Sequence, residues 1–106
     1  MAYIPAISGG KCKIGSFTWA SSGTTKVTCG FKPKQLTIIN TTSLTTRNIC
    51  YDERQSTTKF VMSTSGSNLT SYNIGDTSTW RIKSIDDDGF TMTTGNNNAM
   101  IYFAIG

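Results

Sequence analysis

Side chains able to carry acid–base chemistry are few in this chain, and their spacing matches no catalytic set. The chain has no histidine, which excludes Ser-His-Asp and Cys-His nucleophile systems and removes the commonest tunable acid–base group and metal ligand. Glycosidase chemistry needs two carboxylates at a fixed separation, whereas the acids here fall in predicted turns, at Asp52, Glu53, Asp76 and Asp86–Asp88. We therefore expect a protein that is not an enzyme.

Two short motifs resemble ligand-binding loops but lack the spacing that such loops need. Asp86-Asp87-Asp88-Gly89 clusters carboxylates, which calcium prefers, yet an EF-hand requires a longer loop with a distal glutamate. A β-turn, in which Asp and Gly serve the backbone geometry, is the favoured interpretation. Residues 8–11, Ser-Gly-Gly-Lys, lack the spacing of a phosphate-binding Walker motif. We expect no metal and no cofactor.

The three cysteines also argue against a metal centre. Cys12, Cys29 and Cys50 form no Cys-x-x-Cys pair, which is the usual element of a structural zinc site. An odd number cannot be fully paired within one chain. We expect half-buried or buried free thiols, on or near strands, of the kind found in proteins made in a reducing cytoplasm.

Polar and aromatic residues on predicted loops are the best candidates for ligand binding, because binding residues are concentrated on loops. The candidates are Asp52, Arg54, Tyr72, Asn96, Asn97 and Asn98. Trp19, Phe31 and Trp80 are alternative stacking platforms for sugars or bases. Their placement at alternating apolar positions favours the core instead.

The positive charge is unevenly distributed along the chain. The net charge is +4, and residues 1–50 contain basic side chains but no acid. Such asymmetry fits a nucleic-acid surface, an acidic protein partner, or an ordinary basic sheet face. The lysines alternate with apolar residues, and no aromatic–basic signature of single-strand binders is present. We therefore expect no nucleic-acid partner.

Composition predicts an all-β fold. The chain of 106 residues is about one domain. It is rich in Thr, which suits pleated surfaces, and in the turn residues Gly, Asn and Ser, while Glu occurs only once. Short apolar segments separated by turns favour an antiparallel β-sandwich of about six to eight short strands.

Individual strands follow from the alternation of apolar residues. Residues 1–10 are predicted to be an N-terminal arm and residues 11–106 the sandwich domain. A one-residue slip between Lys11–Ile14 and Phe17–Trp19 suggests a bulge at Gly15, and residues 63–73 are expected to be a long polar loop. The expected strands are 11–19, 24–29, 35–40, 47–51, 58–63, 80–85, 90–92 and 99–105.

The last predicted strand has consequences for assembly. Residues 100–105, Met-Ile-Tyr-Phe-Ala-Ile, are apolar on both faces, so both faces need to be covered and the strand must be central. A two-layer sandwich covers one face, and a neighbouring subunit would cover the other. We expect a homotrimer. The start of the chain resembles no secretion signal and no segment approaches ~20 apolar residues, so we expect synthesis in a cytoplasm without membrane insertion.

The arm carries a second candidate interface. Tyr3, Ile4 and Ile7 are apolar on a chain terminus, which is normally polar unless it is tied down. Lys11 and Lys13 follow and would meet an acidic surface. We expect these five residues to attach the protein to a particle. The alternative is that the arm folds back as an edge strand of its own domain or trimer.

Two segments resemble a known family. They are residues 28–38, Thr-Cys-Gly-Phe-Lys-Pro-Lys-Gln-Leu-Thr-Ile, and residues 81–92, which run from Arg-Ile-Lys-Ser-Ile to Gly-Phe-Thr-Met and are followed by the closing Tyr-Phe-Ala-Ile-Gly of residues 102–106. The pattern resembles the H-type lectin-like sandwich, and it is similar to small domains of tailed-bacteriophage virion surface and fibre proteins. The resemblance implies a trimer that binds sugars between subunits at one loop end.

One departure bears on function. The lectins have a histidine in the loop before the last strand, where this chain has Asn96–Asn98, although Arg81 matches a family arginine. The resemblance therefore favours a virion structural protein, either a capsid decoration or a fibre component. Its partners would be capsid or tail proteins of the same particle, and its location the virion. The alternative is a receptor-binding module that recognises host cell-surface glycans.

Overall fold

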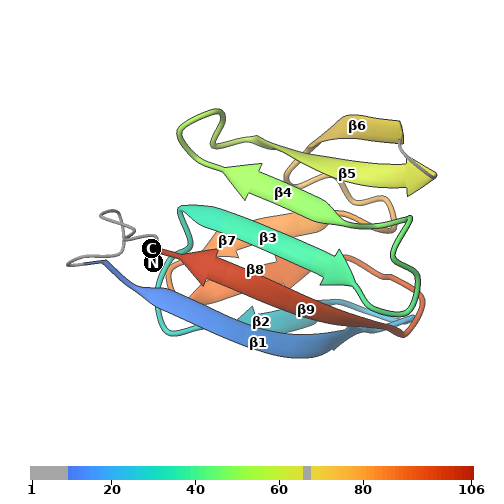
Figure 1. The fold of residues 1–106 in the computed structure, drawn as a ribbon, viewed down its shortest axis with the longest axis horizontal. Helices are drawn as coiled ribbons and strands as arrows, with labels where there is room; N and C mark the ends of the chain where they lie inside the picture. Colours follow the sequence, from blue (N-terminus) through green and yellow to red (C-terminus); the bar gives the residue numbers. More distant parts are fainter. Residues whose placement is uncertain (1–9, 66–67) are drawn as a thin grey trace, which may run out of the picture.

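The computed structural model describes residues 10–65 and 68–106 and shows two antiparallel β-sheets packed face to face (Figure 1). The larger sheet has six strands in the order β1-β9-β3-β4-β5-β6, and the smaller has three in the order β2-β8-β7. The all-β sandwich is confirmed, with nine strands in the described residues in place of the expected six to eight. Their bounds are β1 Cys12–Trp19, β2 Thr25–Thr28, β3 Gln35–Asn40, β4 Ile49–Asp52, β5 Lys59–Ser65, β6 Asn68–Asn73, β7 Ile82–Asp86, β8 Gly89–Met92 and β9 Asn98–Ile105.

The core lies between the sheets and is built by alternation along each strand. In β9 the side chains of Met100, Tyr102 and Ala104 are buried, because successive strand residues point to opposite faces. The small sheet places Phe90 against this layer, with its ring centroid 5.4 Å from that of Tyr102 and 5.8 Å from that of Phe17. These edge-on ring contacts join the two layers.

The central position of the C-terminal strand is confirmed. β9 is hydrogen-bonded to β1 on one side and to β3 on the other. Its inner side chains are covered by the small sheet, while Ile101, Phe103 and Ile105 point to the opposite face of the large sheet.

The predicted bulge at Gly15 is wrong. β1 pairs with β9 without interruption from Cys12 to Trp19. Ile14 is exposed and Trp19 buried because they face opposite sides of one regular strand. The glycine makes room for a ring, since a Cβ on Gly15 would lie 2.7 Å from the hydroxyl of Tyr102.

Two other expectations about the strands are corrected. Much of the predicted loop 63–73 is the edge strand β6, which pairs with β5 along its length. Its polar composition gives no apolar alternation by which the sequence could show a strand, as is common for edge strands. Trp80 lies outside β7, which begins at Ile82, and Trp80 has a left-handed φ of 62°. Periodicity alone could not show that the chain turns sharply before Ile82.

Only one of the three cysteines is buried. Cys29 is buried, but Cys12 and Cys50 are exposed, so their predicted burial is wrong. Both occupy positions of β1 and β4 that point away from the core.

Tyr3, Ile4 and Ile7 lie outside the described residues, and Lys11 and Lys13 are exposed at the start of β1. Within residues 10–65 and 68–106, no helix has the length and apolar character needed to cross a membrane.

Candidate functional site

The six predicted ligand-binding residues do not form one site. Asp52 and Arg54 lie where β4 ends, beside the C-terminal strand residue Ile105. Asn96 and its neighbours lie in the β8–β9 connection, at the end of the sandwich opposite the C-terminus (Figure 1). Tyr72 lies on the edge strand β6.

The Asp52 carboxylate is already satisfied within the chain. Arg54 donates to both oxygens, from Nη2 at 2.8 Å and Nε at 3.1 Å, and its backbone N–H adds a bond of 2.9 Å. Gln35 donates a fourth bond, from Nε2 at 3.2 Å. Hydrogen bonds from the side chain and then the backbone of Arg54 are the main reason that the pKa of Asp52 is lowered to about 2. Asp52 is therefore an ionised anchor of the loop and no proton acceptor at neutral pH.

Tyr72 is held between an aromatic ring and a cation. Its ring centroid lies 5.8 Å from that of Phe60, and the Arg81 guanidinium carbon lies 3.9 Å from the Tyr72 ring centroid. Nη1 of Arg81 donates to the carbonyls of Thr79 and Trp80. Arg81 therefore fastens the β6–β7 connection onto β6.

The asparagines shape their own loop. Asn97 has a left-handed φ of 58°, its N–H donates to the Trp19 carbonyl, and its Oδ1 accepts from the Ser21 N–H at 3.0 Å. Asn98 is the first residue of β9, and Asn96 is exposed between them and Gly95. Asn96 and Asn97 are exposed, whereas Asn98 is half-buried.

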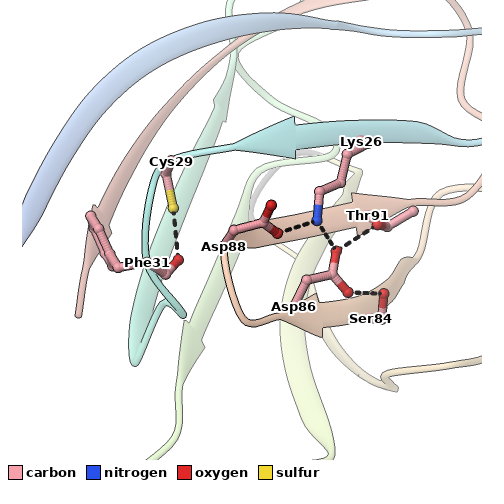
Figure 2. A network of polar contacts seen from close by, with 7 residues as sticks. All are labelled: Lys26, Cys29, Phe31, Ser84, Asp86, Asp88 and Thr91. Atoms are coloured by element: carbon pink, nitrogen blue, oxygen red, sulfur yellow. Dashed lines mark hydrogen bonds and ion pairs between the residues drawn. The ribbon is translucent and has the colours of Figure 1, made fainter.

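The acidic segment 86–88 forms the predicted turn, and a lysine neutralises it (Figure 2). Lys26 Nζ lies 2.7 Å from Asp86 Oδ2 and 2.7 Å from Asp88 Oδ1. Ser84 and Thr91 each donate to the Asp86 carboxylate at 2.7 Å. The network therefore joins β2, β7 and β8 on the outer face of the small sheet.

The pKa shifts of Asp86 and Lys26 agree with a structural role for this network. Burial acts to raise the pKa of Asp86, but the hydrogen bonds from Lys26, Ser84 and Thr91 outweigh it, so that pKa is lowered. The bonds to Asp86 and Asp88 raise the pKa of Lys26. No group of three or more potential metal ligands occurs among the described residues.

The outer face of the large sheet presents several apolar side chains to solvent. A row of paired residues crosses all six strands of the sheet. It consists of Ile14, Phe103, Thr37, Cys50, Val61 and Ser71. Ile14 is 65% exposed, Phe103 39% and Val61 37%. Large apolar side chains in such numbers on one sheet face are unusual for a surface that stays in water.

Three adjacent strands present no charge on this face. We call the outward-facing residues of β1, β9 and β3 the outer apolar face. Its members are Cys12, Ile14, Ser16, Thr18, Ala99, Ile101, Phe103, Ile105, Gln35, Thr37 and Ile39. The apolar run of residues 100–105 predicts that β9 is apolar on both faces, but it does not predict that Ile14 and Ile39 lie beside it. Their alternation with the buried residues of β1 and β3 is the signal that would have found them.

Comparison with models of protein families, with curated protein sequences and with solved structures gives no match to this chain.

Proposed function

We propose that this protein is a non-enzymatic structural protein of a virus particle that associates with further copies of itself through the outer apolar face. The single observation that carries the proposal is the absence of charged residues at the outward-facing positions of three neighbouring strands, β1, β9 and β3, in a chain of net charge +4. The tailed-bacteriophage particle, with its capsid and tail partners, is proposed from the family resemblance alone.

The free energy available to such an interface is substantial. Full burial of one Ile or Phe side chain contributes roughly 1.5–3 kcal/mol, and Ile14, Phe103 and Ile101 are only partly covered within one chain. Transfer of these side chains from water favours association before the costs of lost motion are counted.

A second copy fits this face better than an unrelated charged partner. A cyclic trimer closes through heterologous contacts, and in this basic chain of net charge +4 like charges on the two facing patches would repel. The outer apolar face avoids this repulsion, because its polar members are the neutral residues Gln35, Thr37, Ser16 and Thr18.

The outer apolar face is half of the large sheet. The whole sheet, six strands spaced by ~4.8 Å and each about 20 Å long, covers roughly 600 Å² in projection, and the three strands β1, β9 and β3 cover roughly 300 Å² of it. A standard interface buries about 800 Å² of accessible surface per partner, and accessible area exceeds projected area because side chains protrude. A homotrimer, in which each subunit meets two neighbours, is the assembly proposed from the resemblance.

Light scattering of the full chain tests the association. We expect a mass of three times 11.5 kDa for the wild type, and a folded monomer for Phe103→Asp, since a charge would be buried in the interface. Leu44→Asp is the matched control, because Leu44 is 69% exposed but lies in the β3–β4 connection. This control should remain assembled.

Two outcomes would overturn the assembly. One is a monomeric wild type at tens of micromolar, and the other is dissociation by Leu44→Asp as readily as by Phe103→Asp. The particle is tested separately, by electron microscopy of purified virions from the source with an antibody against this chain. Absence of the chain from virions would overturn the virion role even if the protein is a trimer.

A further inference from the structure

A cavity with polar and apolar walls lies between the two sheets, where the small sheet ends at its edge strand β7. Its volume is about 270 Å³. Residues of β4, of β7 and of three connections between strands line it, and those used below are Lys32, Tyr51, Glu53, Ile74, Lys83 and Ile85. None of these residues belongs to the outer apolar face, so the cavity is a separate feature of the molecule.

The tyrosine of this cavity is buried and its hydroxyl has no partner. Tyr51 is 4% exposed, and within residues 10–65 and 68–106 its hydroxyl makes no hydrogen bond. The one fully enclosed side-chain atom of these residues that lacks a partner is Nε of Arg81, so the Tyr51 hydroxyl reaches solvent through the cavity. Buried polar groups are normally hydrogen-bonded. This hydroxyl therefore indicates a site for a ligand.

The hydroxyl is a hydrogen-bond donor at neutral pH. Burial, and then the negative charges of Glu53 and Asp52, raise the pKa of Tyr51 above its ordinary value. The group therefore keeps its proton and can donate it to an oxygen of a ligand.

A β-bulge places a lysine at the cavity. The pairing of β7 with β8 shifts register between Ile82 and Ser84, which leaves Lys83 without a partner in β8. Bulges redirect side chains and are over-represented next to functional sites. Ser84 donates to Asp86 on the outer face of the small sheet, while Lys83 lines the cavity.

Backbone hydrogen bonds hold the walls of the cavity together. The N–H of Ile74 donates to the Thr58 carbonyl at 2.8 Å, and the N–H of Gly75 donates to the Ile82 carbonyl at 3.1 Å. These bonds join the β6–β7 connection to the β4–β5 connection and to β7. The N–H of Glu53 donates to the Lys34 carbonyl at 2.9 Å. The cavity is therefore pre-formed, as ligand sites usually are.

Charges of both signs meet at the cavity without pairing. Lys32, Lys83 and Glu53 line it, and the ion pairs of the described residues are all made by other side chains. A ligand that carries only a negative charge would meet the two lysines but would leave Glu53 beside a like charge. A ligand that carries both charges can form charge-assisted hydrogen bonds with all three residues.

The rest of the lining fixes the size and character of such a ligand. Ile74 and Ile85 are half-buried side chains that pack against the core and also line the cavity, so they offer contact to an apolar group. The volume of about 270 Å³ is just below the roughly 300 Å³ at which drug-sized sites begin. A small zwitterion with an apolar side chain fits both features.

We propose that this cavity binds a free α-amino acid with an apolar side chain. Lys32, Lys83 and the Tyr51 hydroxyl bind its carboxylate. Glu53 pairs with its ammonium group, and the two isoleucines contact its side chain. The proposal goes beyond the structural function above and does not depend on the assembly or on the virus particle.

The test follows the backbone amide signals of Thr57, Lys83 and Ile85 by NMR while L-leucine is added to the isotope-labelled full chain. Two analogues of leucine are the comparison probes. Isocaproate keeps the carboxylate and the side chain but lacks the ammonium group, and isoamylamine keeps the ammonium group but lacks the carboxylate. We expect a saturable shift with L-leucine and about tenfold weaker binding, or less, of each analogue, because each loses hydrogen bonds between charged groups.

Substitutions assign the two charges of the ligand to residues. Glu53→Gln should remove the preference for the zwitterion, so that isocaproate binds at least as tightly as L-leucine. Lys83→Gln should weaken L-leucine binding about tenfold, whereas Lys13→Gln, an exposed lysine of β1 outside the cavity, is the matched control and should not.

Tyr51→Phe tests the hydroxyl alone. We expect about fivefold weaker binding of L-leucine, with little change in the melting temperature, because the hydroxyl has no partner within the described residues. This variant also serves if Lys83→Gln does not fold.

Three results would overturn the proposal. The first is the absence of a saturable shift with L-leucine at tens of millimolar. The second is equal binding of isocaproate and L-leucine by the wild type, which would indicate a simple anion site. The third is an equal loss of binding in Lys13→Gln and Lys83→Gln, which would indicate a response to net charge and not to this cavity.

Discussion

The backbone of Gly89 passes so close to the carbonyl oxygen of Val27 that there is no room between them for a Cβ atom. Gly89 begins β8 and is paired with Thr28 of β2. Its φ is not left-handed, so the glycine is required by this close approach of two strands and not by the turn before it. The same pairing brings Lys26 to Asp86 and Asp88 (Figure 2).

Gly89→Ala should therefore destabilise the protein strongly. We expect the free energy of unfolding to fall by about 3 kcal/mol, the upper part of the range for overpacking, because the obstructing atom belongs to the backbone. Thr28→Ala on the exposed side of the same pair is the control, with an expected change within about 0.5 kcal/mol. Urea denaturation followed by circular dichroism measures both, and equal values for the two variants would contradict this interpretation of Gly89.

The Asp52–Arg54 pair makes stability depend on pH at the acid end. The pKa of Asp52 is about 2 in the folded protein and about 3.9 in an unfolded chain. The unfolded chain therefore binds a proton first as the pH falls. The contribution of ionised Asp52 to the free energy of unfolding is complete above about pH 4 and is lost as the pH falls toward 2.

Asp52→Asn should remove that part of the pH dependence. We expect the melting temperature of the variant to fall less than that of the wild type between pH 5 and pH 2. Because the pKa of Asp86 is also lowered, the variant should still lose stability in acid, but less than the wild type does. Parallel curves for the two proteins would show that Arg54 does not stabilise the ionised form of Asp52.

Calcium should leave the wild-type melting temperature unchanged at millimolar concentration. Lys26 already binds both carboxylates of the turn, Asp86 and Asp88, and a ligand raises the melting temperature only if it binds the folded state. Lys26→Met should lower the melting temperature slightly, and less so in high salt, because exposed ion pairs are weak and screened. A calcium-dependent rise for the wild type would identify a metal site that the geometry does not support.

Thiol accessibility should separate the cysteines into two classes. Cys12 and Cys50 are exposed, whereas Cys29 is buried with its Sγ 3.2 Å from the Phe31 carbonyl. We expect two thiols to react rapidly in the native protein and the third only after denaturation, with Cys29→Ser removing the slow phase. Rapid reaction of all three would contradict the burial of Cys29.

The absence of an intrachain disulfide stays a prediction that the same titration tests. β9 and β3 lie between β1, which carries Cys12, and β4, which carries Cys50. At ~4.8 Å per strand their Cα atoms are about 14 Å apart, well beyond the roughly 7 Å that a disulfide can bridge. Fewer than three free thiols under denaturing conditions without reductant would contradict the prediction, or would reveal a bond between chains.

Local pattern determined much of the fold. Alternation of apolar residues located β3, β4, β5, β8 and β9, because a strand with one buried face repeats every two residues. The apolar run of residues 100–105 was sufficient to place β9 inside a sheet, since such a strand cannot lie at a solvated edge. β6 was missed because an exposed edge strand has no buried face along most of its length, and thus no period to detect.

Only the tertiary structure decided what the functional candidates are. The sequence identified Asp52, Arg54 and Asn97 as polar loop residues, but a polar residue on a loop is equally able to bind a ligand or its own backbone. In the fold these side chains bind within the chain. Tyr51 and Lys83 lie 32 residues apart and line one cavity only because strands of the two sheets face each other there. The outer apolar face likewise requires the register of β1, β9 and β3, because pairing between strands, and not order along the chain, places Ile14, Phe103 and Thr37 in one row.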